Sequence, residues 1–188
     1  MLIQRILGAF TFRKGIYASV EKDTSFTTTA WIIVAVVAFL NQLGSQATSN
    51  VGNWLIGAIV GTIFAILGFA VGALVINWVG RAVFKAEVTF HELVRTLGLA
   101  YVWQVIGVLG ILASLAGCLL APVMIAAVVL LIVAWLIAVR EALDLDWVKS
   151  ILTVVLGVLA MFVVMALGQW VLSLLGLGGA VMGGFLSS

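Results

Sequence analysis

The residues of this chain that could do chemistry are few, and they do not form a reactive set. His91 is the only histidine and Cys118 the only cysteine, so an internal disulfide is excluded and no His or Cys cluster offers metal ligands. His91 stands beside Glu92 without the nucleophile or second ligand that acid-base, covalent or metal catalysis would need. We therefore expect no catalytic residue, no metal and no cofactor, and the sequence predicts that the protein is not an enzyme.

The composition indicates that a lipid bilayer is the solvent of this chain. Its 188 residues are 65% hydrophobic and 9% charged, whereas ordinary soluble domains are about 25% charged. This balance excludes a soluble domain, and the net charge of +2 is too small to favour nucleic acid as a partner. We predict an all-α fold, a polytopic transmembrane bundle that forms a single membrane domain over residues 1–188.

Five apolar stretches are long enough to cross a bilayer as helices. The predicted spans are 26–43, 54–79, 97–116, 119–139 and 151–175. An interfacial segment, 1–23, precedes them, and a Gly-rich tail follows at 176–188.

The charged residues predict the orientation of the spans. Charged and uncharged segments alternate: charges fall before the first span, between spans two and three, and between spans four and five, while the remaining connections carry none. The positive-inside rule then places the N-terminus in the cytoplasm and the C-terminus outside.

The N-terminal segment has the pattern of an amphipathic helix that lies in the membrane interface. Its apolar residues recur at spacings of three and four, with Arg13 and Lys14 following where lipid phosphates would lie. These apolar residues are Leu2, Ile3, Ile6, Leu7 and Phe10. The helix could simply anchor the N-terminus, or it could sense curvature or dock a partner.

A helix start is predicted at Thr89, because Thr89 and Glu92 have the spacing of a capping box. We expect this helix to lead into span three, with Glu92 and Arg95 as an exposed ion pair. The candidate contacts for a cytoplasmic partner are Arg13, Lys14, His91, Glu92, Arg95 and Tyr101.

Two stripes of small residues are expected to pack helices closely. On span two the stripe is Gly57, Gly61, Gly68 and Gly72, and on span three it is Gly107, Gly110, Ser114 and Gly117. Small side chains let helix backbones approach each other in lipid, so the two stripes could face each other or meet another subunit.

The order of these elements, with Arg95, Gly98 and Tyr101 leading into span three and Trp135 ahead of Arg140, resembles the Yip1 family. The resemblance implies a five-span integral membrane protein. Eukaryotic members act in vesicle trafficking with small GTPases. This chain lacks their long N-terminal region with its Asp-Leu-Tyr-Gly-Pro motif, so GTPase binding is doubtful. The short loops resemble a prokaryotic member, which implies a multi-pass protein of a prokaryotic cytoplasmic membrane.

We expect a non-catalytic membrane scaffold or accessory subunit whose partners are the lipid bilayer and another membrane protein or a second copy, similar to Yip1-family membrane-organisation proteins. Ionisable side chains are absent from the predicted spans, although transporters usually place such groups there. A passive channel or small-solute transporter is one alternative. A subunit of a larger bioenergetic or photosynthetic complex is another.

Overall fold

The computed structural model of the chain describes residues 2–47 and 50–176, and in 113–119 only the backbone. Within these ranges the fold is helical and contains no strand. The elements are α1 (Leu2–Phe10), α2 (Ile16–Glu21), α3 (Phe26–Ser45), α4 (Val51–Phe84), α5 (Phe90–Ala100), the 3₁₀ helix η1 (Tyr101–Leu112), α6 (Ala113–Leu143) and α7 (Trp147–Leu174). The predicted tail, apart from Gly176, lies outside the described residues.

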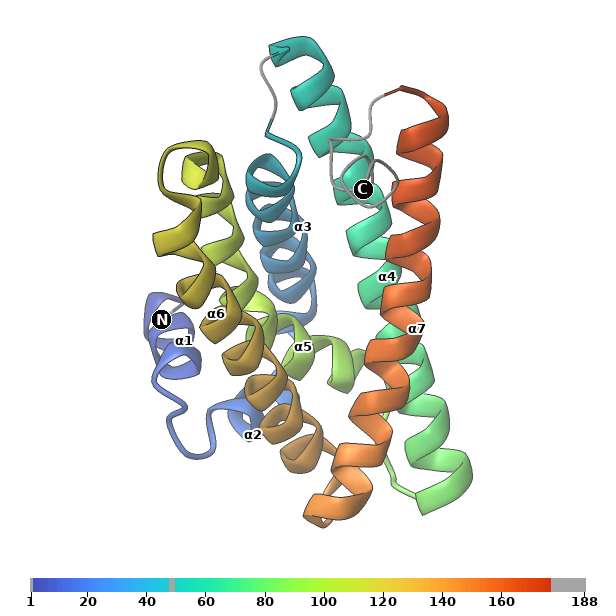
Figure 1. Cartoon of the computed structure of the whole chain (residues 1–188). Coiled ribbons are helices and arrows are strands. Elements are labelled where there is room, and N and C mark those ends of the chain that lie inside the picture. Colours follow the sequence, from blue (N-terminus) through green and yellow to red (C-terminus); the bar gives the residue numbers. More distant parts are fainter. Residues whose placement is uncertain (1, 48–49, 177–188) are drawn as a thin grey trace.

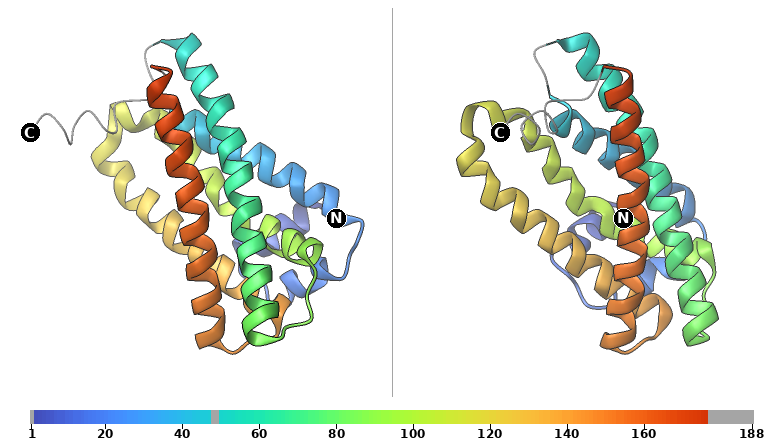
Figure 2. Two further views of the ribbon diagram at one scale, coloured as in Figure 1. Left: turned by 90° about the vertical axis from the view of Figure 1, so that its right-hand side faces the viewer. Right: turned by 45° about the vertical axis from the view of Figure 1, so that its right-hand side comes forward.

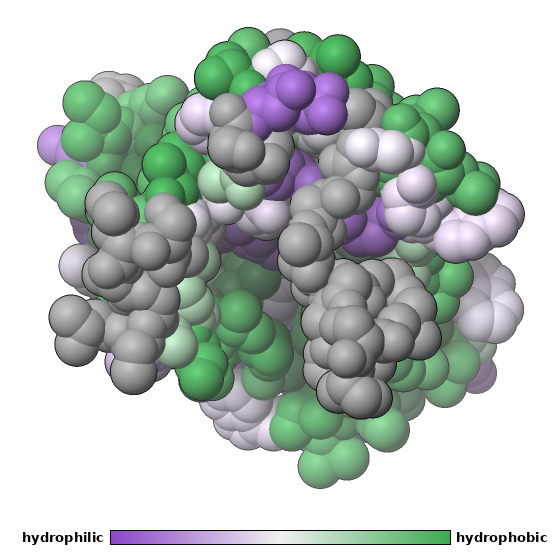
Figure 3. All heavy atoms as spheres, turned by 45° about the horizontal axis from the view of Figure 1, so that its top comes forward, coloured by the Kyte–Doolittle hydropathy of each residue, from purple (hydrophilic) through white to green (hydrophobic). Residues whose placement is uncertain are grey.

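Five of the described helical segments are long and apolar enough to span a membrane, as the sequence predicts. They are Phe26–Ser45, Val51–Phe84, Phe90–Leu112, Leu120–Leu143 and Trp147–Leu174. Their outward faces carry large exposed apolar side chains such as Ile63, Ile125 and Phe162, which a soluble protein would bury. Figure 3 shows hydrophobic residues over much of the periphery of the face that it presents.

The helices form a bundle in which α4 and α7 lie side by side along most of their length (Figures 1 and 2). The C-terminal ends of α4 and α6 and the N-terminal end of α7 lie together at the bottom of Figure 1, with α1 and α2 in the same half. We call this half, where the charged connections gather, the charged end of the bundle. The longest helix, α4, is capped at its N-terminus by Asn50, whose side chain accepts a hydrogen bond from the Asn53 N–H at 3.1 Å.

The third span departs from the predicted α-helix. It is α-helical only to Ala100 and continues as a 3₁₀ helix to Leu112. A 3₁₀ helix rises about 2.0 Å per residue, so 12 residues cover about 24 Å, for which an α-helix needs about 16. Because the 3₁₀ stretch crosses in fewer residues, α6 already begins at Ala113, before the predicted turn at 117–118.

The core of the bundle contains an aromatic cluster that joins four of the spans. The Phe69 ring of α4 packs edge-on against Trp31 of α3, Tyr101 of η1 and Trp135 of α6, with ring centroids 5.4 to 6.2 Å apart. Phe69, Tyr101 and Trp135 are all buried. Edge-to-face pairs of this kind add about 1 kcal/mol each beyond area burial, so the cluster fixes these helices relative to one another.

Candidate functional site

The helix that leads into the third span begins with the predicted capping box. The Thr89 hydroxyl accepts a hydrogen bond from the Glu92 N–H at 3.3 Å, and the Glu92 carboxylate accepts one from the Thr89 N–H at 2.6 Å. Both bonds satisfy N–H groups that a helix start leaves free. The capping box therefore fixes the residue at which α5 begins, and with it the helix face on which the following residues lie.

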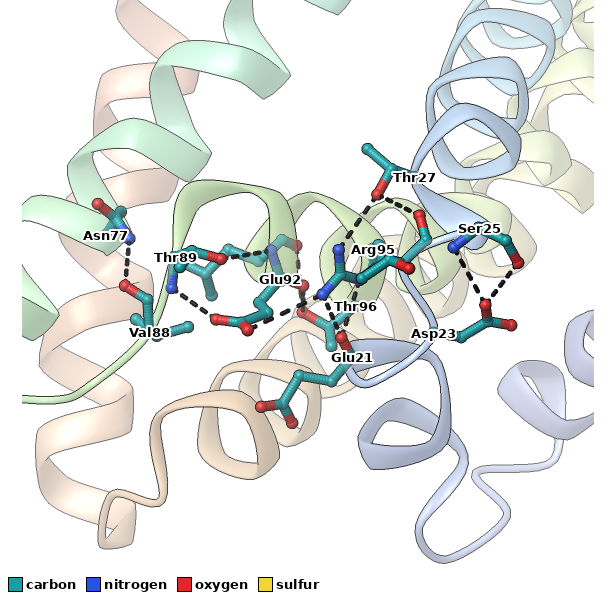
Figure 4. Close-up of polar contacts among 12 residues, drawn as sticks. Glu21, Asp23, Ser25, Thr27, Asn77, Val88, Thr89, Glu92, Arg95 and Thr96 are labelled. Atoms are coloured by element: carbon teal, nitrogen blue, oxygen red, sulfur yellow. Dashed lines mark hydrogen bonds and ion pairs between the residues drawn. The ribbon is translucent and has the colours of Figure 1, made fainter.

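Arg95 lies in the interior of the charged end, which corrects its prediction as half of an exposed ion pair. Only 4% of the residue is exposed, and its guanidinium Nε donates to the Glu21 carbonyl at 2.8 Å, as does Nη2. Nη1 donates to the Thr27 hydroxyl at 3.2 Å, and the Glu92 carboxylate lies 3.9 Å from Nη2 (Figure 4). We call these four residues the Arg95 clamp, because they join α2, α3 and α5.

The clamp explains why the prediction for Arg95 was wrong. The sequence pattern predicts residues 1–23 as a separate interfacial segment, but α2 packs against α5 and α6. The Ala18 N–H donates to the Glu141 carboxylate of α6 at 3.1 Å, so α2 is tied to the bundle on a second side. A buried guanidinium needs acceptors for its N–H groups, and the Glu21 carbonyl at the end of α2 accepts from two of its nitrogens while the Thr27 hydroxyl of α3 accepts from the third.

The six predicted partner contacts separate into buried and exposed residues. Tyr101 is only 3% exposed and belongs to the aromatic cluster, so it and Arg95 are corrected as partner contacts. Glu92 is partly buried and committed to its capping box. Arg13, Lys14 and His91 are exposed, and their role as partner contacts stays a prediction.

A second ionic contact holds α1 against the start of α3. Arg5 donates to the Asp23 carboxylate at 2.7 Å, and its guanidinium lies 4.9 Å from the centre of the Phe26 ring. The hydrogen bond from the Ser25 hydroxyl and the one from Arg5 hold the pKa of Asp23 below its usual value. The N-terminal segment is therefore held at three places: Arg5, the hydrogen bond from Ala18 to Glu141, and the Arg95 clamp.

The backbone carbonyl of Glu21 accepts hydrogen bonds from Arg95, whereas its side-chain carboxyl lies where a negative charge is unfavourable. Burial, followed by the nearby carboxylates of Glu92 and Asp144, raises the pKa of Glu21, and Lys22 and Arg95 oppose that shift. Because the pKa of Glu21 is higher in the folded state than in the unfolded state, its protonated carboxyl contributes to the stability of the fold. This contribution is fully present below the ordinary glutamate pKa of about 4.3. That contribution is lost as the pH rises through the raised value.

Replacing Glu21 with glutamine is thus expected to stabilise the protein at pH 7 and to have no effect below about pH 4. The backbone carbonyl that accepts from Arg95 is unchanged by this substitution. Thermal unfolding of the purified chain in a neutral detergent at several pH values measures the difference. Glu87→Gln, at an exposed position, is the control, and lower stability of Glu21→Gln at pH 7 would contradict the assignment.

The glycine stripe of α4 contacts two helices. A Cβ at Gly61 would meet the Gln42 side chain of α3, one at Gly68 would lie 3.2 Å from Met161 Cγ of α7, and one at Gly72 would lie 3.1 Å from the Gly157 carbonyl oxygen. Gly57 is buried as well. This stripe thus packs within the chain, mainly against α7.

The glycines of η1 pack against α3 and do not face the stripe of α4, which corrects the expectation that the two stripes could meet. A Cβ at Gly107 would collide with Asn41, and one at Gly110 would lie 2.8 Å from the Gly44 carbonyl oxygen. Asn41 also donates to the Gln104 carbonyl at 2.9 Å. In a 3₁₀ helix residues three apart lie in line, so Gln104, Gly107 and Gly110 form one row along α3. The side chains of Ser114 and Gly117 lie outside the described residues.

The partners of both stripes were missed from the sequence. Gly44 of α3 faces Gly107 and Gly110, and Gly157 and Gly168 of α7 face Ile76 and Phe64 of α4. One signal was available, because Gly157 and Gly168 are 11 residues apart and so lie on the same face of an α-helix. Within the part of the chain that the structure describes, no group of three His, Cys, Asp or Glu residues could hold a metal ion.

This fold and this site define a multi-pass α-helical membrane protein whose N-terminal segment is folded onto one end of the bundle. The Yip1 domain model matches residues 8–168, which includes α2, the first four spans, most of α7 and the Arg95 clamp. The chain therefore belongs to the Yip1 family. A search of curated proteins gave no match to the chain, and a search of solved structures gave none either.

Proposed function

We propose that this protein is a non-catalytic scaffold or accessory subunit of a prokaryotic cytoplasmic membrane, which acts by binding lipid and another membrane protein or a second copy of itself. The observation that carries the proposal is the attachment of α1 and α2 to the bundle. Arg5 and the Arg95 clamp hold these helices in place, so Arg13 and Lys14 are presented on a folded surface. A fixed, exposed basic surface is suited to binding.

Family membership supports the same proposal, because Yip1-like proteins of the eukaryotic branch organise membranes. The GTPase partner of that branch is not carried over, since the motif that accompanies it is missing from this sequence. The cytoplasmic position of the charged end follows from the positive-inside rule. It is part of the proposal.

Photo-crosslinking in native membranes tests the proposal. A photoreactive phenylalanine analogue replaces Lys14 or His91 in the full chain, and the same analogue at the exposed Lys149 is the matched control. We expect discrete adducts at Lys14 or His91, identified by mass spectrometry as one membrane protein or a second copy, and at most weak adducts at Lys149. Equal and diffuse labelling at all three positions would contradict it.

A passive channel is a second candidate, favoured by one hollow of about 100 Å³ between α3, η1 and α6. Asn41 and Gln104 line it beside Trp103, whose buried indole N–H has no partner among the described residues. Most of the lining is apolar, whereas a pore needs a polar path. Solute or ion uptake into proteoliposomes above that of empty vesicles would favour this candidate over the scaffold.

A further inference from the structure

The N-terminal helices border an open hollow whose charged lining residues are all basic. It lies between α1 and α2, has a volume of about 280 Å³, and is lined by three cationic side chains and no carboxylate. Its lining residues are Gln4, Arg5, Arg13, Lys14, Gly15, Ile16 and Ser19. Below we call it the basic hollow.

Two of its three cations are not neutralised by the protein. Arg5 is paired with Asp23, but Arg13 and Lys14 make no ion pair or side-chain hydrogen bond with any other described residue. Both are exposed, although the charged end contains several carboxylates. An unpaired arginine next to an unpaired lysine attracts an anion, and arginine can bind two oxygens of one phosphate at once.

The apolar residue Leu7 of α1 adjoins the basic hollow, and Ile3 lies one turn before Leu7 on the same face of this helix. Ile3 is 72% exposed and Leu7 is 57% exposed, while Leu2, Ile6 and Phe10 of the same helix line an apolar groove with α3 and η1. A second hollow contains Leu7 and shares Gln4 and Arg13 with the first. The surface of α1 therefore passes from cationic to apolar within two turns, which matches the change from headgroup to acyl chain in a lipid.

We propose that the basic hollow binds the phosphate of an anionic phospholipid, with Arg13 and Lys14 at the phosphate oxygens and Ile3 and Leu7 against an acyl chain. This inference rests on the proposed function and names the lipid class of its partner. The hollow is about the lower limit for a small-molecule pocket, roughly 300 Å³, so it can hold a headgroup and not a whole lipid. A soluble phosphate would leave Ile3 and Leu7 without a role.

Native mass spectrometry of the purified full chain tests this inference, with dioleoylphosphatidylglycerol as the probe and dioleoylphosphatidylcholine as the neutral comparison. A basic residue at an anionic lipid surface contributes about fivefold in affinity. The double variant Arg13→Gln/Lys14→Gln is thus expected to bind phosphatidylglycerol about 25-fold more weakly. Arg81→Gln/Lys85→Gln removes the same charge from exposed positions elsewhere and is expected to bind as the wild type does.

A second variant and a competitor identify the source of the phosphate. Ile3→Gln/Leu7→Gln is expected to weaken phosphatidylglycerol binding, and glycerol phosphate is expected to compete poorly. Three outcomes would overturn the inference: equal losses in the two charge variants, equal binding of phosphatidylcholine, or full competition by glycerol phosphate. If one of these occurs while the crosslinks at Lys14 or His91 persist, this inference fails and the scaffold function stands.

Discussion

Replacing Arg95 with methionine is expected to lower the free energy of unfolding by about 3 kcal/mol, the largest effect of any single substitution proposed for this chain. Methionine fills much of the same volume but leaves the Glu21 carbonyl and the Thr27 hydroxyl without their donor. An acceptor left buried and unpaired costs about 1 to 3 kcal/mol. The loss should appear as unfolding of the purified chain at a lower mole fraction of sodium dodecyl sulfate.

The controls for Arg95 separate charge from geometry. Arg81→Met removes the same charge at an exposed position and should change stability little. Arg95→Lys keeps the charge but loses the planar fork that reaches both acceptors, so its stability should fall between those of the wild type and Arg95→Met. If Arg95→Met were as stable as Arg81→Met, the clamp would not hold α2 to the bundle.

Replacing Gly157 with leucine is expected to destabilise the packing of α7 on α4 by about 2 kcal/mol. A Cβ at this position would lie 2.5 Å from Ile76 Cγ1 and 3.0 Å from the Gly72 carbonyl oxygen. The Ile76 side chain can move, but the backbone of α4 can give way only if the two helices separate. The same detergent titration measures the loss.

Ala166→Leu is the matched control for Gly157→Leu, because it adds bulk at an exposed position of the same helix. It should leave the unfolding midpoint close to that of the wild type. Equal stability of the two variants would mean that the α4–α7 contact is not as close as the structure places it. Leucine is a better helix former than glycine, so helix propensity alone would stabilise Gly157→Leu, and a loss of stability is assigned to packing.

The helices and the capping box could be predicted from the sequence because each depends on local pattern. A run of about 20 apolar residues needs no knowledge of its neighbours to be a span, and Thr89 and Glu92 satisfy each other within one turn. The third span shows the limit of that approach. Its 3₁₀ section places the glycines of η1 in line with Gly44 of α3, which is a tertiary contact with no local signal.

The candidate site was less predictable for the same reason. Arg95 is two residues before the predicted start of the third span at residue 97, so a position at the membrane surface was the natural prediction. The burial of Arg95 depends on the Glu21 carbonyl at the end of α2. This acceptor is distant in sequence, and only the tertiary fold places it beside Arg95. Contacts of Arg13 and Lys14 with lipid phosphates could be predicted from residue type and position and stay a prediction, whereas the hollow that these residues line depends on the relative placement of α1 and α2.

In the proposed topology the chain crosses the membrane five times, and its charged connections lie on one side of that membrane. Labelling by an impermeant maleimide on intact cells tests it, with single cysteines introduced in a Cys118→Ser background at Lys14, Lys85, Lys149 and Asn50. We expect Asn50→Cys to react from outside and the three lysine positions to react only after the membrane is opened. Reaction of Lys85→Cys or Lys149→Cys from outside, with Lys14→Cys protected, would contradict the account.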